Sequence, residues 1–220
     1  SDAGKFVDNF SAGKLPRTGQ VRMAPLLSPS GRLKGDLTVM SLAEDHYMAI
    51  GSGYLQNYHM HWFEQNIGKR NVVIRNRSDE LATLAIAGPM SRELLQNVAN
   101  GDLSSEAMPF MSVRKMDIGF APCEVARLSF TGELGYEIYT SPIYANSVYD
   151  LLIQTGKHLD IKEFGIRALV SMGMEKGFGA WSREFTPDYT PKMCGFDRFI
   201  DYDKNEFIGQ SAALQDRDAV

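Results

Sequence analysis

Residues 127–139 read RLSFTGELGYEIY, and no other stretch says more about how this chain folds. Its apolar side chains alternate with polar neighbours, which is the period of a half-buried β-strand. They are Leu128, Phe130, Tyr136 and Ile138. The Thr-Gly-Glu-Leu-Gly segment between the two halves supplies a turn. The stretch therefore predicts two strands joined as a β-hairpin.

The predicted hairpin carries two carboxylates, Glu133 in the turn and Glu137 in the second strand. Successive side chains of a strand point to opposite faces, so Glu137 projects away from Tyr136 and Ile138. A carboxylate on the inner face of a sheet is costly unless a donor pairs with it. A ring with adjacent N–H donors, such as an aminopyrimidine, would pair with both oxygens. The alternative is a hairpin with two solvated glutamates, because exposed Glu is the usual case.

The composition is that of an ordinary globular protein. The chain has 220 residues, of which 44% are hydrophobic and 23% charged, so it can form one large domain or two small ones. The net charge of −4 argues against nucleic acid as a partner, because neutralising phosphates needs a basic surface. No run approaches the roughly 20 apolar residues that span a bilayer, and the first residues lack the apolar core of a signal peptide.

The cysteines and histidines predict neither a disulfide framework nor a metal site. Cys123 and Cys194 are the two cysteines, a number that suits a reducing compartment. His59 and His61 lie two residues apart, whereas a helical metal pair needs a spacing of four. We expect His59 to be a satisfied surface or core histidine.

Hydrophobic periodicity along the chain predicts an α+β fold, with strands, hairpins and helices alternating. Strands are expected at 21–27, 36–42, 47–50, 72–74, 81–87, 116–120, 123–130 and around 199–200. Helices are expected at 4–12, 53–65, 91–98, 143–159 and 165–177. Residues 28–31 read SPSG, which is strong turn chemistry and predicts a hairpin there.

Five segments of the chain resemble, in the same order, those of the folate-binding aminomethyltransferase family. Residues 127–139 resemble its Thr-Gly-Glu-x-Gly-x-Glu-Ile signature, and residues 31–39, GRLKGDLTV, resemble its Gly-Gly-x-x-x-Asp-Leu-Thr-Val segment. Residues 84–89, 184–191 and 207–210 match further segments. The family contains the T-protein of the glycine cleavage system and the tetrahydrofolate domains of dimethylglycine and sarcosine dehydrogenases.

The resemblance covers nearly the whole chain, and two segments favour the dehydrogenase-fused branch over the stand-alone T-protein. They are residues 58–63, YHMHWF, and residues 110–111, FM. The resemblance implies an α+β fold of mixed or antiparallel sheets with flanking helices, without the family's C-terminal β-barrel. It implies that residues 1–220 are one tetrahydrofolate-binding region of a longer enzyme, and whether the isolated region is active is left open.

The resemblance also implies the cofactor and the partners. Tetrahydrofolate is the expected cofactor, and an N-methyl amine supplies the one-carbon unit. FAD belongs to an upstream flavin domain of the same longer chain, because nothing here resembles the Gly-x-Gly-x-x-Gly of such a domain. Neither nucleic acid nor a membrane is an expected partner. The expected location is the bacterial cytoplasm or the mitochondrial matrix.

Asp36 is the candidate catalytic residue. It begins a predicted strand directly after Gly35, where an aspartate is more often a turn residue than a catalyst. The resemblance favours catalysis, because the family's functional aspartate occupies this position. Such a carboxylate would hold a folate nitrogen or steady a cationic iminium. Thr38 lies two residues along the same strand face and is a candidate cofactor-binding donor.

The remaining candidate cofactor-binding residues are Gly51, Glu133, Glu137, Tyr139 and Trp181. By the resemblance Glu137 grips the pterin ring and Glu133 is the weaker candidate. Tyr139 shares the face of Glu137. Gly51 permits close backbone approach, although a strand-end glycine explains it equally well. Trp181 offers a stacking surface, against the alternative of a core aromatic.

The chain departs from the family pattern at two places. Residues 23–24 are Met-Ala where many relatives carry Tyr-Thr. Residues 172–177 read MGMEKG against the family's Leu-Arg-Leu-Glu-Lys-Gly, so Gly173 replaces an arginine. Either the pocket is tuned differently or folate affinity is weaker.

The resemblance predicts tetrahydrofolate-dependent one-carbon transfer, a transferase step within an oxidoreductase. The reaction would form 5,10-methylenetetrahydrofolate from an iminium or formaldehyde-level carbon in dimethylglycine or sarcosine degradation. Two alternatives stay open. One is a demethylase that passes an S- or O-methyl group to tetrahydrofolate. The other is a non-enzymatic folate-binding module.

Overall fold

The structure is a computed structural model that describes residues 1–181 and 183–219. Its chain divides into two compact units. The first unit consists of Ser1–Asn76 together with Gly179–Val220, and the second unit consists of Arg77–Phe178. No helix within the described residues is long and apolar enough to cross a membrane.

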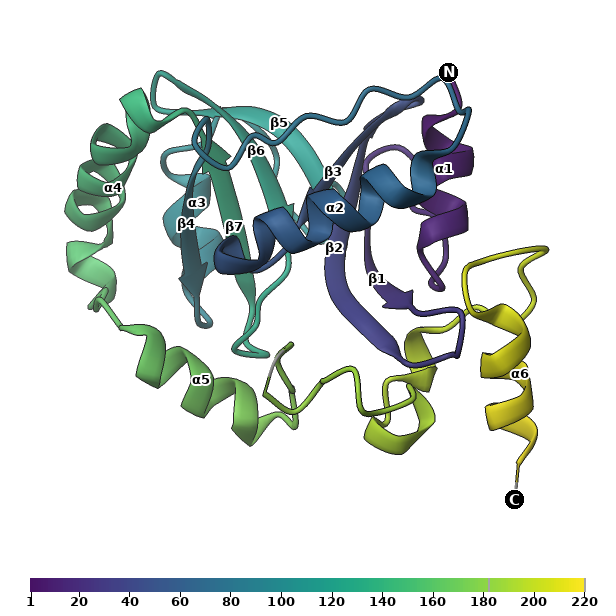
Figure 1. The fold of residues 1–220 in the computed structure, drawn as a ribbon. Helices are drawn as coiled ribbons and strands as arrows, with labels where there is room; N and C mark the ends of the chain where they lie inside the picture. The colour runs from purple at the N-terminus through teal and green to yellow at the C-terminus, as the bar shows by residue number, and fades with distance from the viewer. Residues whose placement is uncertain (182, 220) are drawn as a thin grey trace. The chain divides into compact units, whose positions relative to one another are not determined.

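The first unit is built on a three-stranded antiparallel sheet in the order β1-β2-β3 (Figure 1). Its strands are β1 Val21–Leu27, β2 Leu33–Ala43 and β3 His46–Ile50. Its helices are α1 Ala3–Phe10, α2 Gln56–Ile67 and α6 Gln210–Asp218, with 3-10 turns η1 Gly53–Leu55, η3 Lys192–Cys194 and η4 Asp197–Phe199.

Alternation along β2 separates a core face from a polar face. Leu37 and Val39 are buried and pack with aromatic residues of α1 and α2, among them Phe6 and Phe63. The residues between them point the other way, because side chains of a strand change face at every step. Lys34, Asp36 and Thr38 lie on that second face and are half-buried. The polar face of β2 thus carries the candidate catalytic residue.

The second unit holds a four-stranded antiparallel sheet in the order β4-β7-β6-β5. Its strands are β4 Ala82–Ala87, β5 Ser112–Ile118, β6 Ala121–Arg127 and β7 Gly135–Thr140. Its helices are α3 Ser91–Gln96, α4 Pro142–Gly156 and α5 Ile166–Glu175, with the 3-10 turn η2 Lys157–Leu159.

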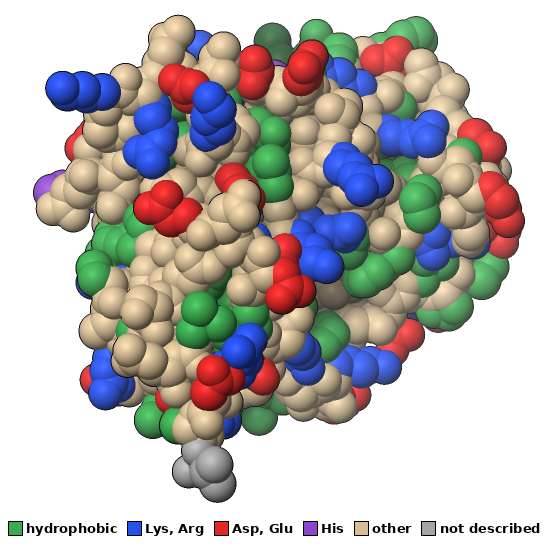
Figure 2. Space-filling view, turned by 90° about the vertical axis from the view of Figure 1, so that its right-hand side faces the viewer, with side chains coloured by type: hydrophobic (Ala, Val, Ile, Leu, Met, Phe, Trp, Pro, Cys, Tyr) green, Lys and Arg blue, Asp and Glu red, His purple; other side chains and the backbone are tan. Residues whose placement is uncertain are grey.

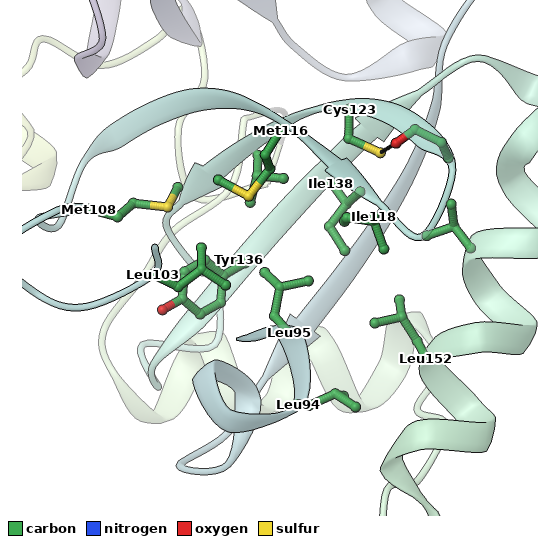
Figure 3. Close-up of a cluster of buried hydrophobic side chains, with 13 residues drawn as sticks. Leu94, Leu95, Leu103, Met108, Met116, Ile118, Cys123, Tyr136, Ile138 and Leu152 are labelled. Carbon is green, nitrogen blue, oxygen red and sulfur yellow. Dashed lines mark hydrogen bonds between the residues drawn. The ribbon is translucent and has the colours of Figure 1, made fainter. Parts of the chain in front are cut away.

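The core of the second unit lies between one face of this sheet and helices α3 and α4. Tyr136 and Ile138 of β7 are fully buried there against Leu95 of α3 and Leu152 of α4 (Figure 3). Because Tyr136 and Ile138 point into the core, the alternating residues of β7 point to the opposite face. Glu137 and Tyr139 therefore share that opposite face.

The α+β prediction is confirmed, and so are the antiparallel sheets with flanking helices. Three predicted strands are wrong in part or entirely. β6 ends at Arg127, so residues 128–134 form a loop instead of a continuing strand. Thr131 N–H donates to Ser129 Oγ in this loop, and such local hydrogen bonds compete with strand pairing. Residues 72–74 lie in irregular backbone, and Phe199 ends the η4 turn.

Candidate functional site

Asp36 has the most strongly shifted pKa among the described carboxyl groups of the first unit. It lies on β2 directly opposite Pro25 of β1. Burial raises the pKa of Asp36 to about 7, and backbone N–H donors at Asp36 itself and at Trp181 limit that rise. A carboxyl group with such a pKa exchanges its proton readily near neutral pH, which is what acid–base chemistry requires. An acid–base role for Asp36 therefore stays a prediction that its raised pKa favours.

A pocket of about 330 Å³ lies in the same unit, and Trp181 links it to Asp36. Its lining residues are Leu55, Tyr58, Trp181, Thr186 and Pro187. Its volume falls within the range of small-molecule sites. The Trp181 backbone is a hydrogen-bond partner of the Asp36 carboxyl, so the pocket wall and the perturbed carboxyl group adjoin. Trp181 also packs against the core cluster that contains Phe185 and Phe196.

Lys34 brings a positive charge to the aromatic side chains of α2. Its ammonium lies 5.7 Å from the Tyr58 ring centroid and 6.0 Å from the Trp62 ring centroid. Cations over aromatic faces at such distances are attracted by the ring quadrupole. Lys34 stands two residues before Asp36 on the same face of β2, and Tyr58 lines the pocket. The pocket can therefore offer a planar ligand both aromatic faces and a nearby cation.

Contacts within the first unit engage the Thr38 hydroxyl and fill the space beside Gly51. Thr38 Oγ1 donates to Met23 Sδ at 3.8 Å, and Met23 is its direct partner across the strands. A Cβ on Gly51 would stand 2.6 Å from the Leu37 side chain and 3.2 Å from the His59 ring. Close packing of the protein itself therefore favours glycine at residue 51, and the expected approach of its backbone to a ligand stays a prediction.

His59 is a core residue without the hydrogen bond that we expected. Its side chain is buried, and its Nε2 atom has no hydrogen-bond partner among the described residues. Burial lowers the pKa of His59, because the charged form is the one that low polarity disfavours. His59 is therefore a core histidine, which is one of the two expected readings, but its Nε2 atom is not satisfied where Gly35 and Gly51 stand against the ring.

In the second unit Glu137 and Tyr139 form a hydrogen-bonded pair on one face of β7. The Tyr139 hydroxyl donates to Glu137 Oε2. Burial raises the pKa of Glu137, and the hydrogen bond from Tyr139 opposes that rise. Burial likewise raises the pKa of the Tyr139 hydroxyl, and the nearby Glu137 charge adds to the effect. The pair is therefore a half-buried carboxylate with one permanent donor.

Glu133 forms an ion pair with Lys176, the residue that follows α5. It lies in the 128–134 loop, and its carboxylate stands 3.1 Å from the Lys176 ammonium. Its side chain is about half exposed, at 49%. Exposed ion pairs contribute little to stability, so the contact serves to direct the Glu133 side chain toward Lys176.

The structure brings the sequence-predicted residues together in two groups. Asp36 and Trp181 adjoin in the first unit, and Glu137 and Tyr139 adjoin in the second. Sequence analysis missed Lys34 and the pocket residues Leu55, Tyr58, Thr186 and Pro187. The strand alternation that puts Thr38 on the same face of β2 as Asp36 also puts Lys34 on that face. The pattern could therefore have identified Lys34.

Acidic and basic side chains are interspersed on the face drawn in Figure 2. Within the part of the chain that the structure describes, no three His, Cys, Asp or Glu side chains converge on a point where they could hold a metal ion.

Comparison with known proteins identifies the family. Residues 1–204 match the family model of the GCVT N-terminal domain. The chain is 32% identical over 217 residues to mitochondrial dimethylglycine dehydrogenase of Rattus norvegicus, covering 97% of this chain and 25% of that protein. It is 31% identical over 220 residues to an aminomethyltransferase of Thermoanaerobacter sp. (strain X514), covering 99% of this chain and 59% of that protein.

The fold matches that of a solved aminomethyltransferase structure. Glycine cleavage system aminomethyltransferase T from Bartonella henselae matches the structure with a TM-score of 0.85 at 22% sequence identity, covering 99% of this chain and 58% of that chain. This chain thus spans between a quarter and three fifths of the length of these relatives. Its fold is that of the aminomethyltransferase T-protein, and the chain belongs to the family of the GCVT N-terminal domain.

Proposed function

We propose that this chain binds tetrahydrofolate and joins a one-carbon unit to it, forming 5,10-methylenetetrahydrofolate. The one-carbon unit comes from an N-methyl amine of the dimethylglycine or sarcosine class, as an iminium or as formaldehyde. The observation that carries the proposal is the half-buried Asp36, whose pKa lies at about 7 beside a pocket of small-molecule size. Similarity to dimethylglycine dehydrogenase over 97% of this chain supports the choice of substrate class.

Glu137 fits the pterin end of tetrahydrofolate. The aminopyrimidine edge of a pterin presents adjacent N–H donors, and an ionised carboxylate accepts two such bonds in parallel. Glu137 stands on β7 directly opposite Ala85 of β4 and Ala126 of β6, whose small side chains leave room beside the carboxylate. The Tyr139 hydroxyl uses one of about four acceptor positions of this carboxylate. The remaining positions can accept from a ligand.

Asp36 is assigned the electrostatic and proton-holding role. Tetrahydrofolate, when bound, supplies the N5 and N10 nitrogens that take up the one-carbon unit. Ionised Asp36 would stabilise positive charge on the incoming amine-derived carbon. Its carboxylate oxygen would then hold the proton that a folate N–H loses, until the departing amine or water takes that proton. With a pKa of about 7, Asp36 has both forms present at neutral pH. Tyr58 and Trp181 offer flat surfaces that exclude water from planar parts of a ligand.

We further propose that a flavin domain of a longer chain generates the carbon to be transferred. This chain covers 25% of rat dimethylglycine dehydrogenase, so most of that relative lies outside the matched region. Oxidation of the N-methyl group belongs to that part, with FAD as the electron acceptor. This chain would then capture the carbon before water releases it as free formaldehyde.

Calorimetry with tetrahydrofolate tests the pterin assignment. We expect Glu137→Gln to weaken binding about tenfold or more, because the neutral amide cannot accept two N–H donors as a carboxylate does. Glu124→Gln is the matched control, since Glu124 lies on the same sheet face opposite Tyr139. The control should bind as the wild type does. Equal affinity of the Glu137→Gln variant and the control would rule out Glu137 as the pterin-binding group.

Product identification tests the reaction. The full-length protein is given tetrahydrofolate with dimethylglycine, with sarcosine, or with a methylsulfonium compound, and the folate product is identified. We expect 5,10-methylenetetrahydrofolate from the amines, slowed about 10²–10⁴-fold by Asp36→Ala. Ser41→Ala on the same strand is the control and should keep the wild-type rate. A methyl-folate product from the sulfonium compound alone would replace our proposal with a demethylase.

A further inference from the structure

We propose that Tyr139 is a positioning residue that keeps Glu137 ionised and oriented, and so extends ligand binding at Glu137 to lower pH. The inference rests on the proposed function, which makes Glu137 the pterin-binding group. It adds a residue that acts on the ligand only through another side chain. It also predicts a pH dependence that no contact between Tyr139 and the ligand would produce.

The geometry of β7 makes Tyr139 the fixed partner of Glu137. The two residues stand two apart on one strand, so their side chains leave the same face. The Tyr139 hydroxyl donates to Glu137 Oε2, and the Tyr139 side chain is only 1% exposed. A phenol has a single O–H donor, and a buried ring has few alternative orientations. The hydroxyl is therefore committed to one carboxylate oxygen, and it fixes the direction of that carboxylate.

The two residues directly opposite Glu137 on the neighbouring strands offer it no side-chain donor. Residues directly opposite each other on antiparallel strands share a face. Alanines stand opposite Glu137 on both sides, whereas Tyr139 has Thr83 of β4 and Glu124 of β6 opposite it. The charged groups on this face of the neighbouring strands are Glu124 on β6, and Lys115 and Asp117 on β5. Of these, Glu124 lies next to Tyr139, and the β5 groups lie one strand farther away.

Removing the Tyr139 hydroxyl should raise the pKa of Glu137. Burial raises the pKa of Glu137, and the Tyr139 hydrogen bond is the contribution that lowers it. Without the hydroxyl the pKa of Glu137 rises further, so a larger fraction of Glu137 is protonated at any mildly acidic pH. A protonated carboxyl loses acceptor capacity for the N–H donors of a pterin. Binding should therefore fail at a higher pH in a Tyr139→Phe variant than in the wild type.

Two measurements on the intact chain test the proposal. The first is the titration of the Glu137 carboxyl, followed by NMR with ¹³C-labelled glutamate and assigned with Glu137→Gln. The second is tetrahydrofolate affinity by calorimetry between pH 5.5 and 8.5. For Tyr139→Phe we expect the Glu137 titration to move to higher pH. Between pH 8.5 and pH 5.5 the affinity of the variant should fall about tenfold more than the affinity of the wild type. At pH 8.5 the two affinities should agree within about threefold.

The chain offers a matched control in Tyr149. Its hydroxyl donates to Glu163 Oε1 at 2.6 Å in the same unit, but this pair is exposed. Tyr149→Phe removes one tyrosine–glutamate hydrogen bond and should leave both the Glu137 titration and the binding profile unchanged. If Tyr139→Phe lowers the melting temperature too far, 3-fluorotyrosine at residue 139 replaces it. This more acidic phenol donates more strongly and should move the Glu137 titration to lower pH.

The two measurements separate the possible failures. A Glu137 titration that is the same in the wild type and in the Tyr139 variants overturns the positioning role, whatever tetrahydrofolate does. A titration that moves while Glu137→Gln binds tetrahydrofolate normally overturns the proposed pterin assignment, and with it the link between Tyr139 and the ligand. A uniform loss of affinity at every pH, without a shift of the acid limb, shows a merely structural Tyr139 and also overturns the proposal.

Discussion

The edge of the Phe130 ring rests against Gly173 of α5, where a Cβ on residue 173 would stand 2.7 Å from the ring atom Cε1. Phe130 also contacts Phe178, with ring centroids 6.2 Å apart. Glycine inside a helix costs about 1 kcal/mol relative to alanine. This contact favours glycine at residue 173, because any side chain there would meet an aromatic ring of the 128–134 loop.

Gly173→Ala is expected to destabilise the chain, although alanine is the better helix former. The new methyl group would displace the Phe130 ring, and overpacking of this kind costs about 1–3 kcal/mol, which exceeds the gain in helix propensity. The free energy of unfolding, measured with a chemical denaturant, gives the result.

The double variant Phe130→Ala/Gly173→Ala is the control for this prediction. Without the ring the alanine has space, so adding Gly173→Ala to Phe130→Ala should stabilise by about 0.5–1 kcal/mol. The same sign in both backgrounds would show that the ring does not hold the glycine in place.

Asp36 should make stability fall as pH rises. Its pKa is raised from 3.8 to about 7, so the folded state holds a proton that the unfolded state releases between these values. The associated stability is complete below pH 3.8 and is lost as pH rises to about 7. Asp36→Asn, which stays neutral, should therefore be more stable than the wild type by roughly 2–4 kcal/mol at pH 8.

Denaturant unfolding at pH 4 and pH 8 checks this. At pH 4 the Asp36→Asn variant and the wild type should differ little, because both side chains are uncharged in the folded state. An advantage of equal size at both pH values would mean that packing, and not ionisation, distinguishes the two side chains.

Lys204 should be important for the stability of the first unit. Its side chain is only 6% exposed. Its ammonium donates to the carbonyls of Asp8, Ser11 and Gly13, and lies 2.8 Å from the Asp8 carboxylate. It thus caps the carboxyl end of α1, where a positive charge is favourable. Lys204→Met should destabilise by about 2–4 kcal/mol, because it leaves buried carbonyls unpaired.

Lys192→Met is the matched control for Lys204→Met. Lys192 also donates to three carbonyls, those of Asp216, Arg217 and Ala219 near the end of α6, but it is exposed. Water can replace its hydrogen bonds, so its loss should cost less than about 1 kcal/mol. Thermal unfolding of both variants shows whether burial makes the difference.

His59 should make the chain sensitive to acid. Burial lowers its pKa below 6.5, so the unfolded state takes up a proton that the folded state rejects. Stability from neutral His59 is complete above pH 6.5 and is lost as pH falls. His59→Leu should reduce the drop in melting temperature between pH 7.5 and pH 5.

His61→Leu on the exposed side of α2 is the comparison for His59→Leu and should leave that drop unchanged. An identical acid sensitivity in the wild type and in His59→Leu would assign the effect to other groups.

Local patterns predicted most of the framework. Alternation placed β1, β2 and β3, and turn residues placed the hairpin between the first two strands. Local patterns predicted residues 127–139 less well. The 128–134 loop forms side-chain hydrogen bonds, and β6 ends at Arg127. Residues 72–74 have strand-like composition, yet composition does not supply a neighbouring strand to pair with.

The candidate site was predicted as residue types and not as an arrangement. Alternation placed Asp36 and Thr38 on one face of β2, and Glu137 and Tyr139 on one face of β7. The same pattern contained Lys34, but nothing in the sequence tied it to the aromatic rings of α2. Those contacts depend on how the helix packs on the sheet, which is a long-range property.

The sequence by itself therefore determined the α+β class, most element positions and, through five segments in order, the family. The tertiary structure decided which of the candidate groups are chemically unusual. Asp36 and Glu137 have raised pKa values because chain segments distant in sequence bury them, and the backbone amide next to Asp36 comes from Trp181. Desolvation depends on everything that surrounds a group in space, whereas a sequence pattern records only its neighbours along the chain.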